Sequence, residues 1–305
     1  AGATVLEGPE DLISVSKVVI KVKEPTMAEC KLLQPHQILF CYLHLAAFPE
    51  QTRLLCESGA TAVGFETVST ADGQLPLLKP MSQIAGRLAV QNAVHYLQKH
   101  EGGRGVLMSG VGGVERGKIL IIGGGTAGEN AASVGVGLGA EVTIFDRSLA
   151  RLDYLADKFG PNLNYVYPTS KAYDHYLCNA DIVIGSVLIP GASAPKLVSR
   201  NMIGNMKDGA VIADIAIDQG GCLETSRPTS HDEPTYIVDN VIHYCVANIP
   251  SAVPLTSTKA LSNSISPYVQ ILAETANSTE LVANSHPLKS GVNIYKGEVC
   301  LDNLL

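Results

Sequence analysis

The chain has 305 residues, of which 46% are hydrophobic and 17% charged, a balance typical of a globular protein of about two domains. A formal net charge of −7 argues against nucleic acid or an anionic membrane as a partner. We expect neither a membrane-spanning segment nor a signal peptide, because no apolar stretch reaches about 18 residues. Seven scattered cysteines without a Cys-x-x-Cys indicate reduced thiols in a cytoplasmic protein.

The first part of the chain alternates strand-like and helix-like segments, which predicts an α/β domain. Strands are expected at residues 16–23, 37–45 and 61–68, with a helix at 49–59 between the last two. Ser82 is expected to cap a helix that runs to about His100. A glycine-rich tract over residues 102–113 ends that helix.

The segment that follows carries the most specific pattern in the chain. Lys118–Ile122 is a short apolar run typical of a buried strand, and it leads into Gly-x-Gly-x-x-Gly at residues 123–128. A small-residue segment then predicts a helix, and residues 140–146 predict a second strand that ends on Asp146, 18 residues after the last glycine. This order of strand, glycines, helix, strand and acid predicts a dinucleotide-binding βαβ unit, with a glycine-rich surface turn as the alternative.

Each residue of this motif has a separate expected role. Gly123 makes the tight turn, Gly125 lets the backbone approach a pyrophosphate, and Gly128 lets the helix pack on the strand. Asp146 is expected to accept hydrogen bonds from the ribose hydroxyls and to repel a 2′-phosphate, which favours NAD over NADP. Arg147, which follows directly, would soften that repulsion.

The α/β alternation continues after the motif. Strands are expected at residues 181–188, 209–218 and 244–249, and a long helix at 256–276 leaves the nucleotide domain. Strands separated by helices predict a Rossmann-type, doubly wound parallel sheet. The tail after Asn277 has no clear pattern and is not assigned.

Polar residues stand where four predicted strands end, which is where ligands bind in an open parallel sheet. They are Lys23, His44, Asp218 and Asn248. Each also has a structural explanation. Lys23 could be a solvated residue of a strand edge, and His44 a core histidine bonded to a backbone carbonyl. Asp218 could cap a turn, and Asn248 could serve the turn before Pro250. No histidine pair has zinc-ligand spacing, and no metal site is predicted.

Several segments together closely resemble the alanine dehydrogenase family, part of the alanine dehydrogenase/NAD(P) transhydrogenase alpha family. They are Lys21–Pro25, Leu43–Ala47, Pro80–Ser82, Gly102–Leu107, Asp214–Gly221 and Val246–Asn248. The resemblance implies a discontinuous α/β catalytic domain, with an NAD domain inserted through two connecting helices. The expected division is residues 1–77 for the first catalytic part, 78–253 for the NAD-binding Rossmann domain with one connecting helix, and 254–305 for the other helix and the second catalytic part.

The resemblance also implies the reaction and the residues that serve it. Such an enzyme oxidises L-alanine to pyruvate and ammonia with NAD, runs the reverse amination, and is usually a homohexamer. Lys23 falls on the substrate-binding position, and His44 and Asp218 fall on catalytic positions. The positions implied to bind the cofactor are Ser82, Gly123, Gly125, Thr126, Gly128, Asp146, Arg151, Val187, Leu188, Ile215, Asp218, Val246 and Asn248.

These residue types suit the chemistry. A cation at Lys23 would stabilise negative charge on oxygen while water hydrolyses an imine, and a histidine titrating near neutrality can move the protons. The division of acid and base roles between His44 and Asp218 stays open. The family also has an N-terminal segment, with an arginine that clamps the substrate carboxylate, and no part of this chain resembles it. The expected catalytic domain is therefore N-terminally truncated, with a sheet edge or an apolar helix face exposed.

Two other functions remain as alternatives. One is a catalytically impaired NAD-binding remnant, and the other is the NAD(H)-binding part of a transhydrogenase. The Gly-Gly-Arg-Gly-Val-Leu tract at residues 102–107 and the His-Leu-Ala-Ala motif at 44–47 favour the dehydrogenase over the transhydrogenase. The presence of Lys23, His44 and Asp218 together favours it over a remnant, which needs none of them.

Overall fold

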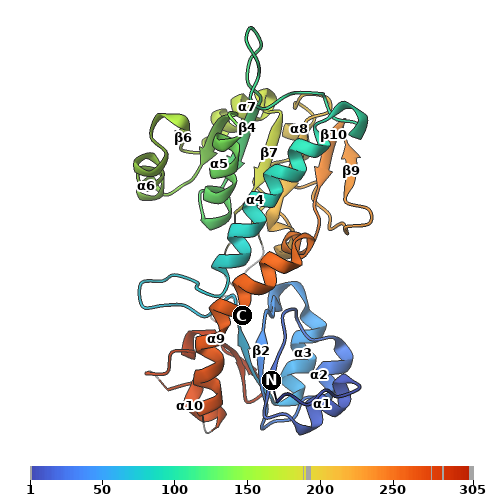
Figure 1. The fold of residues 1–305 in the computed structure, drawn as a ribbon, viewed down its shortest axis with the longest axis vertical. Helices are drawn as coiled ribbons and strands as arrows, with labels where there is room; N and C mark the ends of the chain where they lie inside the picture. The colour runs from blue at the N-terminus through green and yellow to red at the C-terminus, as the bar shows by residue number, and fades with distance from the viewer. Residues whose placement is uncertain (1, 188, 190–193, 276, 284, 302–305) are drawn as a thin grey trace. The chain divides into compact units, whose positions relative to one another are not determined.

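The computed structural model describes residues 2–187, 189, 194–275, 277–283 and 285–301. It divides into two compact units (Figure 1). Unit 1 contains residues up to Pro80 and from Thr258 onward, and unit 2 contains Met81–Ile189 and the chain up to Ser257. Both units are α/β, which confirms the fold class expected from the sequence.

Unit 1 is built on a five-stranded sheet of order β1-β2-β3-β11-β12. Its strands are β1 (Val18–Ile20), β2 (Ile38–Cys41), β3 (Thr61–Gly64), β11 (Val292–Tyr295) and β12 (Glu298–Val299). The first three are parallel, while β11 runs antiparallel to β3 and β12 antiparallel to β11. All four residues of β2 and of β3 are buried, as expected for strands covered on both faces.

Short helices and 3-10 turns alternate along the chain with the strands of this sheet. They are α1 (Pro9–Val15), α2 (Met27–Leu32), the 3-10 turn η1 (Leu45–Ala47), α3 (Pro49–Ser58), α10 (Ser278–Leu281) and the 3-10 turn η6 (Lys289–Gly291). The α2 helix starts with a capping box, in which Thr26 accepts from the N–H of Glu29 and the Glu29 carboxylate accepts from the N–H of Thr26. The long helix α9 (Pro254–Glu274) begins in unit 2 and continues in unit 1.

Unit 2 is built on a seven-stranded sheet of order β6-β5-β4-β7-β8-β10-β9. Its strands are β4 (Lys118–Ile122), β5 (Glu141–Phe145), β6 (Asn164–Val166), β7 (Ile182–Gly185), β8 (Val211–Asp214), β9 (Thr235–Val238) and β10 (Val241–Tyr244). Every neighbouring pair is parallel except β9 and β10. This is the doubly wound order of a dinucleotide-binding fold, with one antiparallel strand added at its edge.

Helices cover both faces of the unit 2 sheet, in agreement with Figure 1. The helical segments of this part of the chain are α4 (Lys79–Tyr96), η2 (Lys99–Glu101), α5 (Thr126–Gly137), α6 (Leu149–Phe159), η3 (Gly160–Asn162), α7 (Ser170–Asn179), α8 (Arg200–Ile203), η4 (Ile215–Gln219) and η5 (Ile249–Ala252). Along β4, Ile119 and Ile121 belong to the apolar cluster under α4, α5 and α6, whereas Leu120 and Ile122 belong to the cluster under α7 and α8. The consecutive apolar residues of β4 therefore contribute to two hydrophobic cores, one on each face of the sheet.

Several expectations from the sequence were wrong in detail. Ser82 does not cap α4, because that helix starts at Lys79 with Pro80 in its first turn, where a missing N–H costs nothing. The strand predicted at residues 209–218 ends at Asp214 and turns into η4. The sequence analysis missed α1, α2, α6, β6, α7, α8 and β9, and its strand at residues 244–249 overlaps β10 only at Tyr244. It also left the tail that forms β11 and β12 unassigned.

The β1 end of the unit 1 sheet is apolar and accessible. Ile20 is 40% exposed and Val22 is 52% exposed, and among the described strands β1 pairs only with β2. In α1, Leu12 and Val15 are also exposed.

Candidate functional site

Three glycines shape the loop between β4 and α5, each for a different reason. Gly123 has a φ of +102°, and a Cβ there would lie 3.0 Å from the carbonyl group of Ser186. A Cβ on Gly128 would lie 1.9 Å from the carbonyl oxygen of Gly123, so the helix approaches the strand closely. A Cβ on Gly125 would meet no described atom within 4 Å. The open space lies at the N-terminus of α5, which has no side-chain cap, and this cradle fits a pyrophosphate.

The start of α5 is also bordered by α4. A Cβ on Gly86 would lie 2.0 Å from the carbonyl oxygen of Ala127, so the two helices are nearly in backbone contact there. Ser82 lies one turn earlier on the same face of α4. Thr126 is the first residue of α5. The structure therefore carries Ser82 and Thr126 on elements that meet at the glycine loop.

The end of β7 forms another border of this loop. A Cβ on Gly123 would lie 3.0 Å from Cγ2 of Val187, the second residue after the strand. Ser186 donates its hydroxyl to the carbonyl oxygens of Ile122 and Gly123, at 3.0 and 2.8 Å. Leu188, which the sequence also marked, lies outside the described residues.

Asp146 stands directly after β5, as the sequence predicted. Its Oδ2 accepts a hydrogen bond from the N–H of Gly124 at 2.8 Å, and its Oδ1 accepts one from the N–H of Ser148 at 2.8 Å. The hydroxyl of Ser148 in turn caps α6 by accepting from the N–H of Arg151. The acid is thus held beside the middle residue of the Gly-x-Gly turn.

Arg151 reaches the same turn from α6. Its Nε donates to the carbonyl oxygen of Gly124 at 2.5 Å, and its Nη2 pairs with the carboxylate of Glu129. The guanidinium lies over the ring of Tyr154, 4.6 Å from the ring centroid. Burial alone would raise the pKa of Glu129, but hydrogen bonds from Lys158 and Arg151 lower it below its ordinary value.

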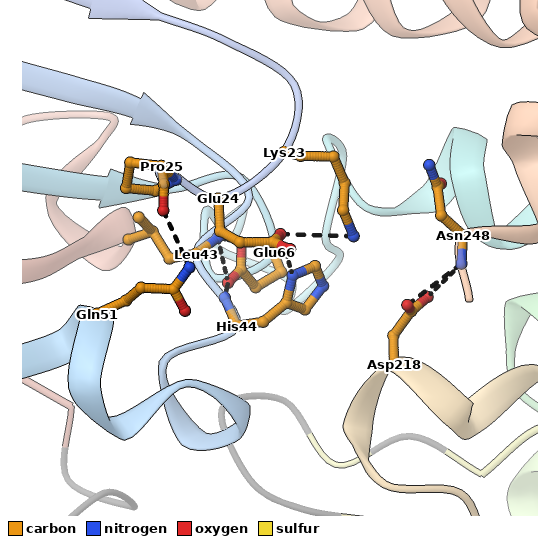
Figure 2. Close-up of polar contacts among 9 residues, drawn as sticks. All are labelled: Lys23, Glu24, Pro25, Leu43, His44, Gln51, Glu66, Asp218 and Asn248. Atoms are coloured by element: carbon orange, nitrogen blue, oxygen red, sulfur yellow. Dashed lines mark hydrogen bonds and ion pairs between the residues drawn. The ribbon is translucent and has the colours of Figure 1, made fainter. Parts of the chain in front are cut away.

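A second group of predicted residues comes from the loops after β8 and β10. Asp218 lies in η4, and its two carboxylate oxygens accept hydrogen bonds from the N–H of Asn248, at 3.2 and 3.3 Å (Figure 2). Asn248 has a φ of 56° and a ψ of 51°, a left-handed conformation that asparagine tolerates, and it leads into η5. The turn role considered for Asn248 is therefore real. Ile215 opens η4, and the buried Val246 lies between β10 and Asn248.

The turn-capping role considered for Asp218 belongs to Asp214 instead. The carboxylate of Asp214 is fully buried and accepts from the N–H of Ala216 at 3.0 Å, the N–H of Cys222 at 2.8 Å and the hydroxyl of Ser226 at 2.6 Å. Burial raises the pKa of Asp214, and these hydrogen bonds oppose the increase. The two N–H bonds lie on either side of Asp218, so Asp214 fixes the loop that carries it.

The third group lies in unit 1, where strands β1 and β2 end. Nδ1 of His44 lies 3.4 Å from Oε2 of Glu24, and Nζ of Lys23 lies 3.4 Å from the same oxygen (Figure 2). Burial would raise the pKa of Glu24, but the hydrogen bond to His44 and the charge of Lys23 outweigh it and lower this pKa to about 2. The His44 ring therefore faces a carboxylate rather than a purely apolar core.

Glu66 holds the same histidine through its backbone. Its carboxylate, only 5% exposed, accepts from the N–H of Leu43 at 3.0 Å and from the N–H of His44 at 2.7 Å. His44 adopts a left-handed conformation with a φ of 46° and a ψ of 42°. Such backbone costs free energy in a non-glycine residue and persists only where its surroundings enforce it.

The sequence analysis missed Glu24, Glu66 and Asp214. A usable signal existed for Glu66 and Asp214, because each stands within two residues of the end of a parallel strand, at the edge where ligands bind. Glu24 lay between two residues already singled out, in Lys23-Glu24-Pro25. Carboxylates that hold functional residues are easily mistaken for surface charge when only the sequence is read.

Other kinds of site find no support within the described residues. No cluster of three or more histidine, cysteine or acidic side chains there could hold a metal ion. All seven cysteines belong to the described chain and are free thiols. None of the described helices is long and apolar enough to cross a membrane.

Comparison with known families now identifies the lineage of this arrangement. A family model described as "Alanine dehydrogenase/PNT, N-terminal domain" matches residues 1–85, and one described as "Alanine dehydrogenase/PNT, C-terminal domain" matches residues 89–302. The chain belongs to the alanine dehydrogenase/PNT family.

Individual relatives agree with this assignment. An alanine dehydrogenase from Halomonas elongata is 47% identical over 299 residues, which are 98% of this chain and 80% of the relative. The solved structure of an L-alanine dehydrogenase is 46% identical, with a TM-score of 0.88 over 99% of this chain and 82% of that one. A transhydrogenase from Sinorhizobium meliloti is 21% identical with a TM-score of 0.75, covering 97% of this chain and 82% of that one, and shows a shared fold alone.

Proposed function

We propose that this member of the alanine dehydrogenase/PNT family catalyses the NAD-dependent oxidation of L-alanine to pyruvate and ammonia, and the reverse reductive amination. One observation carries the proposal. The same chain holds a glycine loop open at Gly125 in unit 2 and a cation, a carboxylate and a histidine together in unit 1, at Lys23, Glu24 and His44. The 47% identity to an alanine dehydrogenase supports it.

The residues of unit 2 fit the cofactor. NAD, when bound, supplies the acceptor for the hydride that leaves the α-carbon of alanine. Gly125 leaves room for its pyrophosphate at the N-terminus of α5, Gly123 and Gly128 allow the turn and the close helix packing that form this loop, and Asp146 suits the ribose hydroxyls. The other positions proposed to contact it are Ser82, Thr126, Arg151, Val187, Leu188, Ile215, Asp218, Val246 and Asn248.

In unit 1, Lys23 is the proposed binding group for the substrate. Its ammonium can attract the carboxylate or the carbonyl oxygen of the substrate, and it stabilises negative charge on oxygen when water adds to the imine. Glu24 limits the freedom of this ammonium, since the two groups are 3.4 Å apart. A lysine is a point charge, so it fixes the substrate less rigidly than a bidentate arginine.

His44 is the proposed proton carrier. The Glu24 carboxylate beside Nδ1 favours the tautomer with its proton on Nδ1, which places the ring lone pair on Nε2. Nε2 can then accept the proton that the amine or the attacking water releases. The overall reaction balances: L-alanine, NAD⁺ and water give pyruvate, ammonium, NADH and a proton. Asp218 is the second proposed catalytic residue, and it also holds the N–H of Asn248.

The test is the absorbance of NADH after L-alanine and NAD are added to the purified chain at mildly alkaline pH. We expect turnover in the native sequence, loss of turnover in His44→Ala, and turnover close to native in His36→Ala, which removes an exposed histidine. A folded chain that binds NADH but gives no L-alanine-dependent reduction would contradict the proposal and would support an NAD-binding remnant instead.

We also propose a homo-oligomer, on the basis of the family, with the hexamer as the expected form. Static light scattering of the purified protein would give its mass.

Free thiols at all seven cysteines favour a reducing compartment, and we propose that this compartment is the cytoplasm.

A further inference from the structure

Glu129 is placed where it can affect the choice of cofactor. It lies in the first turn of α5, directly after the last glycine of the loop, and its side chain is only 16% exposed. Its two oxygens are divided between two cations: Oε2 pairs with Nη2 of Arg151, and Oε1 lies 2.5 Å from Nζ of Lys158. One carboxylate therefore engages two positive side chains of α6.

Arg151 is close to the proposed ribose site. Its Nε binds the carbonyl oxygen of Gly124, while the N–H of that same residue binds Oδ2 of Asp146. The acid expected to bind the ribose and the guanidinium held by Glu129 thus both bind the backbone of one residue, Gly124. A cation in this position would attract the 2′-phosphate of NADP, which carries about −1.5 to −2 charges near neutral pH.

We propose that Glu129 is a specificity-determining residue, which favours NAD over NADP by occupying Arg151 and Lys158. This inference rests on the proposed NAD-dependent function. The charges of Glu129 and Asp146 together balance those of Arg151 and Lys158, so the cluster offers no net positive charge to a 2′-phosphate. Asp146 repels the 2′-phosphate directly, whereas Glu129 forms ion pairs with the two cations that would otherwise bind this phosphate.

A purely structural role predicts a different result. If Glu129 only ties α5 to α6, its loss weakens the binding of both cofactors alike. If it determines specificity, its loss changes their ratio. Arg147 next to Asp146 is exposed and is left unchanged in every variant, so its contribution cancels.

The experiment measures dissociation constants of NADH and NADPH by fluorescence titration, together with the thermal midpoint of each variant. Glu129→Gln keeps the shape of the side chain and removes its charge. We expect NADPH to bind about tenfold more tightly relative to NADH, the size of one charge-assisted hydrogen bond. The matched control is Glu141→Gln, which removes an exposed carboxylate 3.9 Å from Lys118 and should leave the ratio unchanged.

Two further variants identify the path of the effect. In Glu129→Gln with Arg151→Gln, the gain in NADPH binding should disappear. Arg151→Gln alone should leave the NADPH to NADH ratio as in the native chain, because Glu129 already occupies that cation. Arg151→Gln alone still tests the inference if Glu129→Gln does not fold, because it keeps Glu129.

Clear results would overturn the inference. These are a parallel change in both dissociation constants in Glu129→Gln, a gain that survives Arg151→Gln, or a fall in the ratio in Arg151→Gln alone. Because cofactor binding needs no L-alanine, the ratio can be measured even if the native chain fails to oxidise alanine. Failure of the proposed reaction and failure of this inference are therefore separate outcomes.

Discussion

The carboxylate of Glu66 accepts a hydrogen bond from the backbone N–H of His44 at 2.7 Å, and this N–H belongs to a residue in the left-handed conformation. The contact reaches the proposed proton carrier through its main chain rather than its ring. Since the Leu43 N–H binds the same carboxylate, Glu66 fixes two consecutive peptides just after β2. It is a positioning residue for His44.

Removal of Glu66 should therefore reduce activity as well as stability. Glu66→Ala leaves two buried N–H groups without their acceptor, which costs about 2–4 kcal/mol in the free energy of unfolding. Glu66→Gln keeps an acceptor oxygen and should be milder. We expect kcat to fall more than KM rises in both, and thermal melting with steady-state kinetics would show it. Glu57→Gln on the exposed face of α3 is the control. Equal losses in Glu66→Gln and the control would exclude a positioning role.

The low pKa of Glu24 predicts a specific pH dependence of stability. The folded state lowers this pKa from 4.5 to about 2, so the carboxylate contributes its full stabilisation above pH 4.5. This contribution is lost as the pH falls from 4.5 towards 2. Urea unfolding of the native chain and of Glu24→Gln at pH 6 and pH 3 would measure it. The difference between the two proteins should be larger at pH 6, and a difference that does not vary with pH would contradict the ion pair.

The glycine loop offers a matched pair of substitutions. Gly125→Ala adds a methyl group to open space at a negative φ, so the melting temperature should stay close to native. The methyl group should nevertheless weaken NADH binding by at least about tenfold, because it occupies the approach of the pyrophosphate. Gly128→Ala places its methyl 1.9 Å from the carbonyl oxygen of Gly123 and should lower the melting temperature by several degrees. A large loss of stability in Gly125→Ala would refute this interpretation.

Asp214 should act on the Asp218 loop without touching the substrate. In Asp214→Ala the hydroxyl of Ser226 and two backbone N–H groups lose a buried acceptor, with an expected cost of about 2–4 kcal/mol. Asp214→Asn retains part of the network and should recover part of that loss. Hydrogen exchange at residues 215–222 is the direct measurement, since the loop should exchange faster while β4 remains protected. Unchanged exchange in Asp214→Ala would show that the loop is held by other contacts.

Some of the fold could be predicted from the sequence because local patterns and tertiary structure agree there. In β4, α5 and β5, apolar runs, glycines and the final acid all point to one structure, and the strand at Lys118–Ile122 has the predicted bounds. The alternation of strands and helices likewise predicted the doubly wound sheet. The resemblance added the role of each site residue, which patterns alone could not supply.

The missed strands have identifiable causes. β9 and β10 are joined by Asp239 and Asn240, both with positive φ, a pair of turn residues that flanking apolar runs should have revealed. The turn between β11 and β12 uses Lys296 and Gly297 at positive φ, and lysine is an uncommon residue there. The other neighbour of β11 is β3, more than 220 residues earlier in the chain, and a local pattern cannot predict that pairing.

The site residues could likewise be predicted only in part from the sequence. Lys23 and His44 could be chosen because parallel strands end at one edge, but their relation to Glu24 depends on side-chain geometry. The strand predicted through Asp218 was too long because apolar residues continue into η4, whose buried Ala216 and Ile217 resemble strand residues in sequence. The spacing of apolar residues in a sequence does not distinguish a short buried 3-10 turn from a strand.

The pairing of β3 with β11 also bears on how the protein is made. The hydroxyl of Thr67 and the side chain of Asn293 meet at 2.6 Å although 226 residues separate them. A ribosome adds about 5–20 residues per second, so roughly 10–45 s pass between the synthesis of the first partner and that of the second. During that time β3 emerges with one edge unpaired, while the seven strands of the other unit are all completed. The nascent chain must therefore keep one edge of β3, a buried strand of unit 1, from pairing with other strands until residues 292–295 have been made.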